Sequence, residues 1–299
     1  MTTTCDTATN PGGVLHEPVL EWYAEHARDL PWRAPDATPW GVMVSEFMLQ
    51  QTPVSRVLPV WERWMEEWPT PAALAAEEPG EAVRAWGRLG YPRRALRLHA
   101  AARSIVEHHG GEVPSERDEL AALPGVGEYT AAAIATFAHG RRHAVLDTNV
   151  RRVLARIEGG TAAPGASLTV AERRRAEQLL PQEPAVAAVW SVAVMELGAL
   201  VCRAVTPLCE RCPVAERCRW RAAGHPAYDG PARRVQTYAG TDRQCRGRLL
   251  EVLRTSEGPV HRSNLERVWD AVEQRERCLT SLVDDGLAVQ VGPSTYRLP

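Results

Sequence analysis

Apolar residues return at helical spacing along most of the chain. They recur every three or four positions over residues 19–30 and again over residues 42–68, which predicts long helical stretches. Residues 69–111 continue the pattern in shorter pieces, because Pro and Gly residues interrupt it and a Gly-Gly pair ends it. Strand signals are weak until the last residues of the chain. The pattern therefore predicts a mainly α-helical protein.

Three segments depart from this pattern. Residues 1–17 are polar and contain Gly and Pro, which predicts a disordered N-terminus. Residues 226–240 are rich in Gly, Pro and Arg and are typical of a linker. After them, three helical segments precede "LAVQV" and "TYRLP", which have the pattern of two strands around a Gly-Pro turn. This order predicts a small winged-helix-like module over residues 241–299.

Length and composition set the broad class. A chain of 299 residues that is 44% hydrophobic can bury a sizeable core, and its length suggests about two domains. The longest apolar run, "WSVAVMELGALVC", is too short to span a bilayer and contains Glu196, and the N-terminus has no signal-peptide pattern. We therefore expect a cytoplasmic protein that does not bind membranes.

Charge is unevenly distributed. The net charge of −2 argues against a uniformly basic nucleic-acid-binding protein. Residues 201–250, however, contain ten arginines and only four acidic residues. One face of the protein can therefore still meet phosphate groups.

The chain contains no lysine, because all 35 of its basic residues other than histidine are arginine. Arginine stays protonated and is a poor nucleophile. A Schiff base between a side-chain amine and a sugar aldehyde is therefore unavailable, and only the N-terminal amine is left as an exception.

Four of the seven cysteines crowd into "CRAVTPLCERCPVAERC" with the spacing C-x6-C-x2-C-x5-C. An odd total and this crowding are untypical of a disulfide framework. Four thiolates so close together suit a tetrahedral zinc or an iron–sulfur cube, and the spacing does not decide between them. The predicted ligands are Cys202, Cys209, Cys212 and Cys218.

The stretch "LPGVGEYTAAAI" has the pattern of a hairpin between two helices. Its glycines permit positive φ and close backbone approach, and the N-terminus of the second helix suits a phosphate oxygen. Such a hairpin can hold a DNA backbone without reading sequence, although an ordinary helix connection has equal weight. The predicted DNA contacts in this stretch are Gly125, Val126, Gly127 and Thr130.

Two carboxylates lie at informative places. Asp147 in "LDTNVRR" is first of all the expected N-cap of a helix, a role that can also fix its carboxylate in place. Glu46 in "VSEFMLQQT" has apolar neighbours, and the helix pattern alone favours a solvent-exposed position. A buried Glu46 would instead be suited to act as a general acid near neutral pH.

These elements, in this order, resemble the helix-hairpin-helix base-excision glycosylases, and among them most closely the MutY-type adenine glycosylases. The resemblance covers about residues 17–223 and rests on "LPWR", "SEFMLQQT", "LGY", "LPGVGEYTAAAI", "LDTNVRRVLAR", "MELGALVC" and the cysteine loop. It implies a fold of two helical lobes, one over residues 32–143 and one over residues 18–31 and 144–225. It also implies a [4Fe–4S] cluster and, with the Arg and Ala bias, an origin in a high-GC bacterium.

The resemblance implies roles for individual residues. The protein would remove adenine that lies opposite 8-oxoguanine or guanine in double-stranded DNA. It would act as a monomer associated with the nucleoid. Glu46 would protonate the base, ionised Asp147 would stabilise the sugar cation, and Tyr129 and Asn149 would position them. Tyr129 occupies the position of the catalytic lysine in bifunctional relatives such as endonuclease III, so the enzyme would be monofunctional. The remaining implied DNA contacts are Gln51, Tyr91 and Arg33.

Two parts of the sequence depart from the family pattern. Ser191 and Val192 stand where relatives usually have Asn followed by Gln or Glu, and the C-terminal module is much smaller than the usual Nudix-like domain. The module is either a helical tail packed on the core or a source of DNA or partner contacts through Arg243, Arg246, Arg248 and Arg262. Alternative functions are removal of thymine from T·G pairs and non-catalytic DNA binding.

Overall fold

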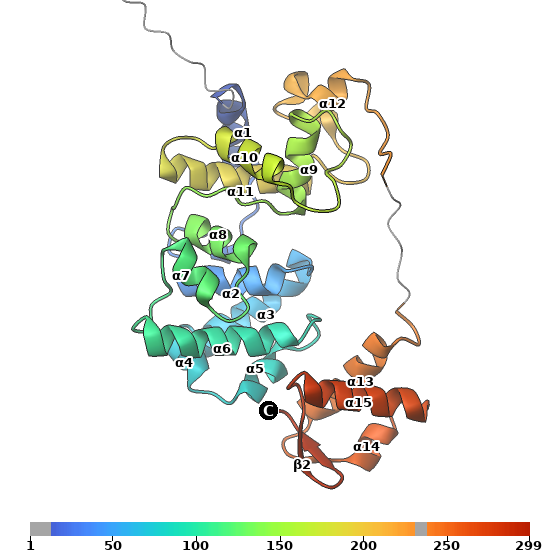
Figure 1. The fold of residues 1–299 in the computed structure, drawn as a ribbon. Coiled ribbons are helices and arrows are strands. Elements are labelled where there is room, and N and C mark those ends of the chain that lie inside the picture. Colours follow the sequence, from blue (N-terminus) through green and yellow to red (C-terminus); the bar gives the residue numbers. More distant parts are fainter. Residues whose placement is uncertain (1–12, 231–237) are drawn as a thin grey trace, which may run out of the picture. The chain divides into compact units, whose positions relative to one another are not determined.

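The computed structural model describes residues 13–230 and 238–299. Helices make up most of these residues (Figure 1), as the hydrophobic pattern predicts. Within the described ranges, none of the helices has the length and apolar character needed to cross a membrane.

Helix α1 (Gly13–His26) corrects one expectation about the N-terminus. The disorder predicted for residues 1–12 lies outside the described residues. For residues 13–17 the prediction is wrong, since these residues form the first turns of α1. Leu15, Val19 and Trp22 lie on one face of this helix and are buried, so packing stabilises a segment whose composition suggested a flexible chain.

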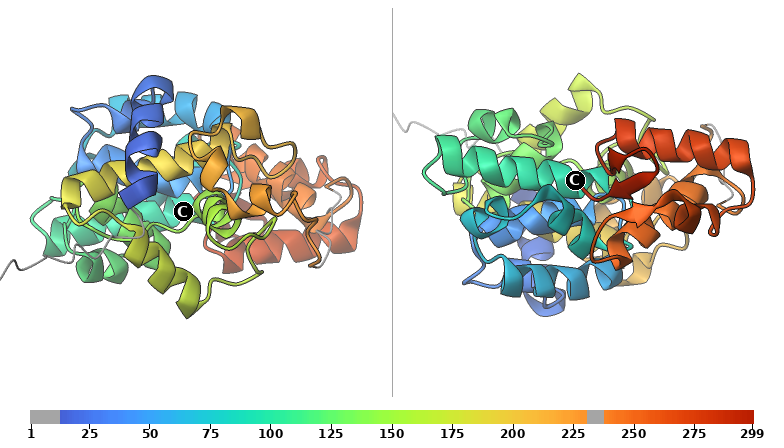
Figure 2. Two further views of the ribbon diagram at one scale, coloured as in Figure 1. Left: turned by 90° about the horizontal axis from the view of Figure 1, so that it is seen from above. Right: turned by 90° about the horizontal axis from the view of Figure 1, so that it is seen from below.

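The described part of the chain divides into two compact units. Unit 1 comprises residues 13–42, 115–121 and 127–230, and unit 2 comprises residues 43–114, 122–126 and 238–299. Unit 1 is built around α11 (Pro184–Leu200), against which α1 and α9 (Thr148–Ile157) pack (Figures 1 and 2). Its core includes Trp190, Leu197 and Trp220. The other elements of unit 1 are η1 (Pro31–Arg33), most of α7 (Arg117–Ala122), α8 (Glu128–Phe137), α10 (Val170–Leu179), η2 (Cys209–Arg211), η3 (Ala215–Arg217) and α12 (Arg219–Ala222).

Unit 2 is built around α6 (Arg93–His108), which packs on α4 (Pro71–Ala75) and α5 (Pro79–Trp86). Its core contains a group of tryptophans in which the ring centroids of Trp64 lie 4.9 Å from Trp68 and 5.7 Å from Trp86. The apolar run predicted over residues 42–68 is two helices, α2 (Pro39–Leu49) and α3 (Val54–Glu67). The break falls where Gln51 has φ 56° and Pro53 precedes α3.

The C-terminal residues of unit 2 contain the three predicted helices, α13 (Asp242–Thr255), α14 (Arg262–Glu266) and α15 (Val272–Asp284). The two predicted strands, β2 (Val289–Gly292) and β3 (Thr295–Arg297), pair in antiparallel fashion. A third strand, β1 (Val260–His261), pairs with β3 and gives the order β1-β3-β2. The sequence missed β1 because two residues carry no alternating pattern.

This C-terminal module packs on the rest of unit 2. The backbone N–H of Gly80 in α5 donates to the carbonyl of Pro299 at 2.8 Å, and Arg84 donates to the carbonyl of Ser256 at 3.0 Å. A Cβ atom added to Gly80 would lie only 2.5 Å from that Pro299 oxygen, so the contact depends on glycine. Arg93 at the start of α6 forms a 3.2 Å ion pair with Asp285.

Candidate functional site

The hairpin between α7 and α8 is present where the sequence predicts it. Leu123 and Val126 are buried and anchor the turn, and the Val126 N–H donates to the Leu123 carbonyl at 3.1 Å. Gly125 has φ +80°, and a Cβ there would lie 2.6 Å from Cβ of Arg97, so both conformation and space require glycine. No side chain caps α8 at Gly127, which leaves its first-turn N–H groups directed along the helix axis.

Tyr129 and Thr130 lie in the first turn of α8. Tyr129 is half-buried and Thr130 is buried. Tyr129 packs against Ala132, Ala133 and Val145, so its ring is fixed by the core of unit 1. The side chain of Thr130 is only 4% exposed.

Asp147 is the N-cap of α9, as its sequence predicts. Its Oδ1 accepts from the Val150 N–H at 2.7 Å, and its Oδ2 accepts from Nδ2 of Asn149 at 2.8 Å. Burial raises the pKa of Asp147 above its ordinary value, while the hydrogen bonds from Val150 and Asn149 partly oppose this shift. The carboxylate is thus held in one orientation with both of its oxygens used.

A chain of hydrogen bonds runs from Asp147 to the cysteine loop. Asn149 Oδ1 accepts from Nη2 of Arg152 at 2.8 Å, and the same Nη2 donates to the Gly198 carbonyl at 2.7 Å. Nε of Arg152 donates to the carbonyl of Cys202 at 2.8 Å. Arg152 is only 9% exposed, so this cation lies between the carboxylate and the cysteine loop as an internal link.

The link requires close approach of α9 and α11. A Cβ atom added to Gly198 in α11 would lie 2.7 Å from Cβ of Asn149. Such a distance is shorter than real Cβ contacts, so a larger residue would push Asn149 away from Asp147. Sequence reasoning missed Arg152 and Gly198, although an arginine inside the apolar face of an amphipathic helix is a signal that could have indicated a buried cation.

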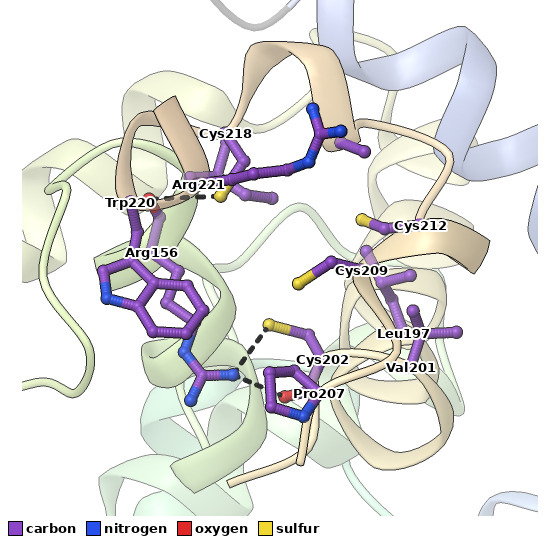
Figure 3. Close-up of a pocket in the computed structure, with 12 residues that line it drawn as sticks. Arg156, Leu197, Val201, Cys202, Pro207, Cys209, Cys212, Cys218, Trp220 and Arg221 are labelled. Carbon is purple, nitrogen blue, oxygen red and sulfur yellow. Dashed lines mark hydrogen bonds between the residues drawn. The ribbon is translucent and has the colours of Figure 1, made fainter. Parts of the chain in front are cut away.

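The four predicted cysteine ligands line one hollow in unit 1 (Figure 3). Arg156 lies beside it, with Nη1 3.4 Å from Sγ of Cys202 and its guanidinium 4.5 Å from the ring centroid of Trp220. Burial, and after it the neighbouring thiols, raise the pKa of Cys212 to about 11. Four thiolates here would need a cationic group between them, so the donor set fits a metal centre.

The four thiols lie around this hollow. Among the described residues, no three His, Cys, Asp or Glu side chains converge on a position that would hold a single metal ion. The four sulfurs instead surround the hollow from different sides (Figure 3).

Glu46 lies in α2 within unit 2 and is only 7% exposed. Its neighbours Val44, Phe47 and Met48 are fully buried. The solvent-exposed position that the helix pattern favoured is therefore wrong, because both faces of α2 are covered at this point.

Gln51 and Tyr91 are brought together in unit 2. The Tyr91 hydroxyl donates to Oε1 of Gln51 at 3.3 Å, and Tyr91 is 48% exposed. Both residues have positive φ, 56° for Gln51 and 48° for Tyr91, which is strained for non-glycine residues. The pair is therefore a surface feature that the surrounding structure holds in an unfavourable backbone conformation.

Arg94 stabilises the turns at Gln51 and Tyr91 through hydrogen bonds from its guanidinium group. Its Nη1 donates to the carbonyls of Phe47, Met48 and Gln50 at 2.8, 3.1 and 2.7 Å, and its Nη2 donates to the Gly90 carbonyl at 3.1 Å. Burial lowers the pKa of Arg94 to about 10. This buried cation caps the C-terminus of α2 and ties the Gln51 turn to the Tyr91 turn.

Arg33 has a partner within unit 1. Its Nη1 donates to Oε2 of Glu196 at 2.9 Å, and Arg28 binds the same carboxylate through Nε at 2.6 Å. Burial alone would raise the pKa of Glu196, but the bonds and charges of Arg28 and Arg33 outweigh it and the pKa is lowered. In the sequence, Glu196 was noted only as an interruption of an apolar run. In the structure it is fully buried and its carboxylate binds two arginines.

Comparison with known proteins shows which family the chain belongs to. A model of the "HhH-GPD superfamily base excision DNA repair protein" family matches residues 44–178. The chain is 49% identical over 292 residues to the adenine DNA glycosylase of Mycobacterium tuberculosis (strain CDC 1551 / Oshkosh), covering 97% of this chain and 95% of that protein. It is 52% identical over 281 residues to the adenine DNA glycosylase of Mycolicibacterium smegmatis, covering 94% of each.

Among solved structures, the fold is similar to that of a thermostable thymine-DNA glycosylase. The TM-score is 0.63 at 26% identity, over 70% of this chain and 96% of the other. The match to the Mycobacterium tuberculosis protein covers 97% of this chain and so includes the C-terminal module. The match to the solved structure covers 70% of this chain. The chain therefore belongs to the helix-hairpin-helix base-excision DNA repair superfamily and, within it, to the adenine DNA glycosylases.

Proposed function

We propose that this protein removes adenine paired with 8-oxoguanine or guanine from double-stranded DNA by hydrolysing the N-glycosidic bond. The observation that carries this proposal is the 49–52% identity to mycobacterial adenine DNA glycosylases over nearly the whole chain. Buried Glu46 and the fixed carboxylate of Asp147 support it, because hydrolysis of a nucleoside needs an acid and an anion. We expect it to act as a monomer on the DNA of the nucleoid.

Glu46 and Asp147 would have different roles in the reaction. Adenine is a poor leaving group unless it is protonated, and a neutral Glu46 would protonate N7 and later activate water. The sugar develops positive charge as the base leaves, and ionised Asp147 would stabilise it. The hydrogen bonds from Val150 and Asn149 favour that ionised form against the effect of burial. Asn149 and Tyr129 would position the two groups.

The target base must first leave the duplex, which costs a few kcal/mol and costs less at a mispair. Gln51 would fill the space left in the stack, and Tyr91 would contact the opposite purine. Their strained backbone and mutual hydrogen bond support this role, because such strain is typical of binding sites. The hairpin at Gly125 to Thr130 would hold the DNA backbone, and Arg33 is a further proposed contact.

The hollow between the four cysteines would hold a [4Fe–4S] cluster. Cys202, Cys209, Cys212 and Cys218 would be its ligands, and the cluster would supply the positive charge that compensates their thiolates. Arg152 and Arg156 hold the loop carbonyls of Cys202 and Arg203 in place. The loop is therefore tied to α9, at whose start Asp147 lies.

Glu46→Gln tests the catalytic assignment. The variant should bind mispaired duplexes with wild-type affinity and show no excision, because the amide keeps the shape but cannot donate the acid proton. Retained turnover would remove Glu46 from the acid role. Borohydride trapping with wild type should give no covalent adduct, since the chain has no lysine.

A further inference from the structure

The C-terminal module brings one arginine to the Gln51–Tyr91 pair. Cζ of Arg243, near the start of α13, lies 5.1 Å from the ring centroid of Tyr91. The same guanidinium lies 5.8 Å from the ring centroid of Tyr238, which precedes α13. Both rings are exposed, 48% for Tyr91 and 54% for Tyr238. An exposed cation between two exposed aromatic rings is therefore part of the surface that carries Gln51.

Two other module arginines that the sequence singled out form ion pairs, whereas Cζ of Arg248 lies 5.8 Å from the ring centroid of Trp269. Arg246 pairs with Asp285 at 2.6 Å, and Arg262 pairs with Glu276. Asp242, the neighbour of Arg243 in sequence, is held by Arg277 at 3.0 Å. Arg243 has no ion pair with any carboxylate in the part of the chain that the structure describes. Its donors are thus available to a ligand, whereas those of its neighbours serve the fold.

The placement of Arg243 is determined by the packing of the module. The contacts of Gly80 with Pro299, of Arg84 with Ser256 and of Arg93 with Asp285 fix α13 and α15 within unit 2. Cζ of the buried Arg94 also lies close to Tyr91, 5.6 Å from the ring centroid. Two arginines, a buried one of α6 and an exposed one of the module, therefore lie within cation–π distance of the same ring.

We infer that the C-terminal module completes the contact with the DNA strand opposite the excised base, and that Arg243 is the residue that makes it. This inference rests on the proposed function and extends it, since it assigns a recognition role to a module that lacks the size of the usual reader domain. Arg243 donates to an acceptor oxygen or nitrogen of that strand, on the base opposite or on the phosphate beside it. A guanidinium fork matches the O6 and N7 acceptors of guanine and the oxygens of a phosphate. Tyr91 and Tyr238 hold the plane of the fork by stacking.

The test compares Arg243→Gln with wild type on duplexes that carry adenine opposite 8-oxoguanine, guanine and cytosine. Binding is measured by fluorescence anisotropy at several salt concentrations, and excision is measured in single turnover. Binding does not require catalysis, so a wild type that excises nothing would refute the proposed function without deciding this inference. Arg103→Gln is the control, because it removes one exposed charge of unit 2 about 15 Å further along α6 from Tyr91.

We expect Arg243→Gln to weaken binding about 10-fold or more, with Arg103→Gln near wild type. A loss that is larger opposite 8-oxoguanine and guanine than opposite cytosine assigns the contact to the base edge. A uniform loss with a smaller salt slope assigns it to phosphate. Arg243→Lys also distinguishes a base contact from a phosphate contact, since a lysine restores a phosphate contact but not a bidentate contact to a base. Binding, salt slope and base preference that all equal those of Arg103→Gln would overturn the inference.

Discussion

Arg152→Leu is the change that tests the internal link between Asp147 and the cysteine loop most sharply. Arg152 is 9% exposed and donates to Asn149 Oδ1, to the Gly198 carbonyl and to the Cys202 carbonyl at 2.7 to 2.8 Å. Leucine fills part of the space but provides no donor, so each of the three acceptors loses a hydrogen bond, and the Cys202 carbonyl keeps a second, longer one from Nη1 of Arg156 at 3.5 Å. Each such loss costs about 1–3 kcal/mol, and water entry offsets part of it, so we expect a total of about 4 kcal/mol.

The change should also affect excision in the molecules that stay folded. Asn149 loses the bond that orients its amide toward Asp147, and a displacement of about 1 Å in a catalytic group can cost about 100-fold in rate. We expect a 10- to 100-fold slower single-turnover excision of adenine, with a lower yield of the brown cluster absorbance. Urea unfolding and a single-turnover assay normalised to DNA-binding-competent protein measure the two effects separately.

Arg151→Leu is the matched control on the same helix. Arg151 pairs with Glu172 at 3.0 Å and donates to the carbonyls of Gly165 and Ser167, none of which touches Asp147 or the cysteine loop. Its loss should lower stability and leave the rate per folded molecule unchanged. If Arg152→Leu also excises at the wild-type rate with wild-type cluster content, the hydrogen-bond chain does not position Asp147.

The remaining predictions concern the carboxylate and the cluster. Burial raises the folded-state pKa of Asp147, so its contribution to stability is fully present below the ordinary carboxyl pKa and is lost as the pH rises through the raised value. Asp147→Asn should therefore abolish excision, and the urea stability of wild type relative to the variant should fall as the pH rises from acid to neutral; a relative stability that rises with pH would contradict the pKa direction. Cys209→Ser should lose the cluster absorbance and weaken DNA binding, because one of four ligands around the hollow is gone. Stoichiometric zinc in the wild-type protein would contradict the cluster assignment.

Local sequence patterns predicted the features that depend on nearby residues. The hairpin glycines, the N-cap at Asp147 and the grouping of four cysteines each follow from short spacings, and the structure has all three. The three C-terminal helices and their hairpin were likewise evident from periodicity. Residue roles in catalysis came only from resemblance and stay predictions.

Features that depend on distant contacts were missed. Arg94 binds carbonyls 44 to 47 residues earlier in the chain, and Arg152 binds carbonyls 46 and 50 residues later. Nothing near Arg94 in sequence distinguishes it from the exposed arginines that surround it, and the one local signal at Arg152 is its position on the apolar face of α9. The burial of Glu46 was missed for the same reason, because a helix pattern does not show what covers its polar positions.

The most direct test of the proposed function is single-turnover cleavage of three duplexes, carrying A opposite 8-oxoguanine, A opposite G, and T opposite G, with and without alkali after the reaction. The proposal predicts strand breaks at adenine that depend on alkali, and none at thymine. Breaks only at thymine would assign the chain to the other branch of the superfamily. No break on any duplex, with binding intact, would contradict catalysis by Glu46 and Asp147 altogether.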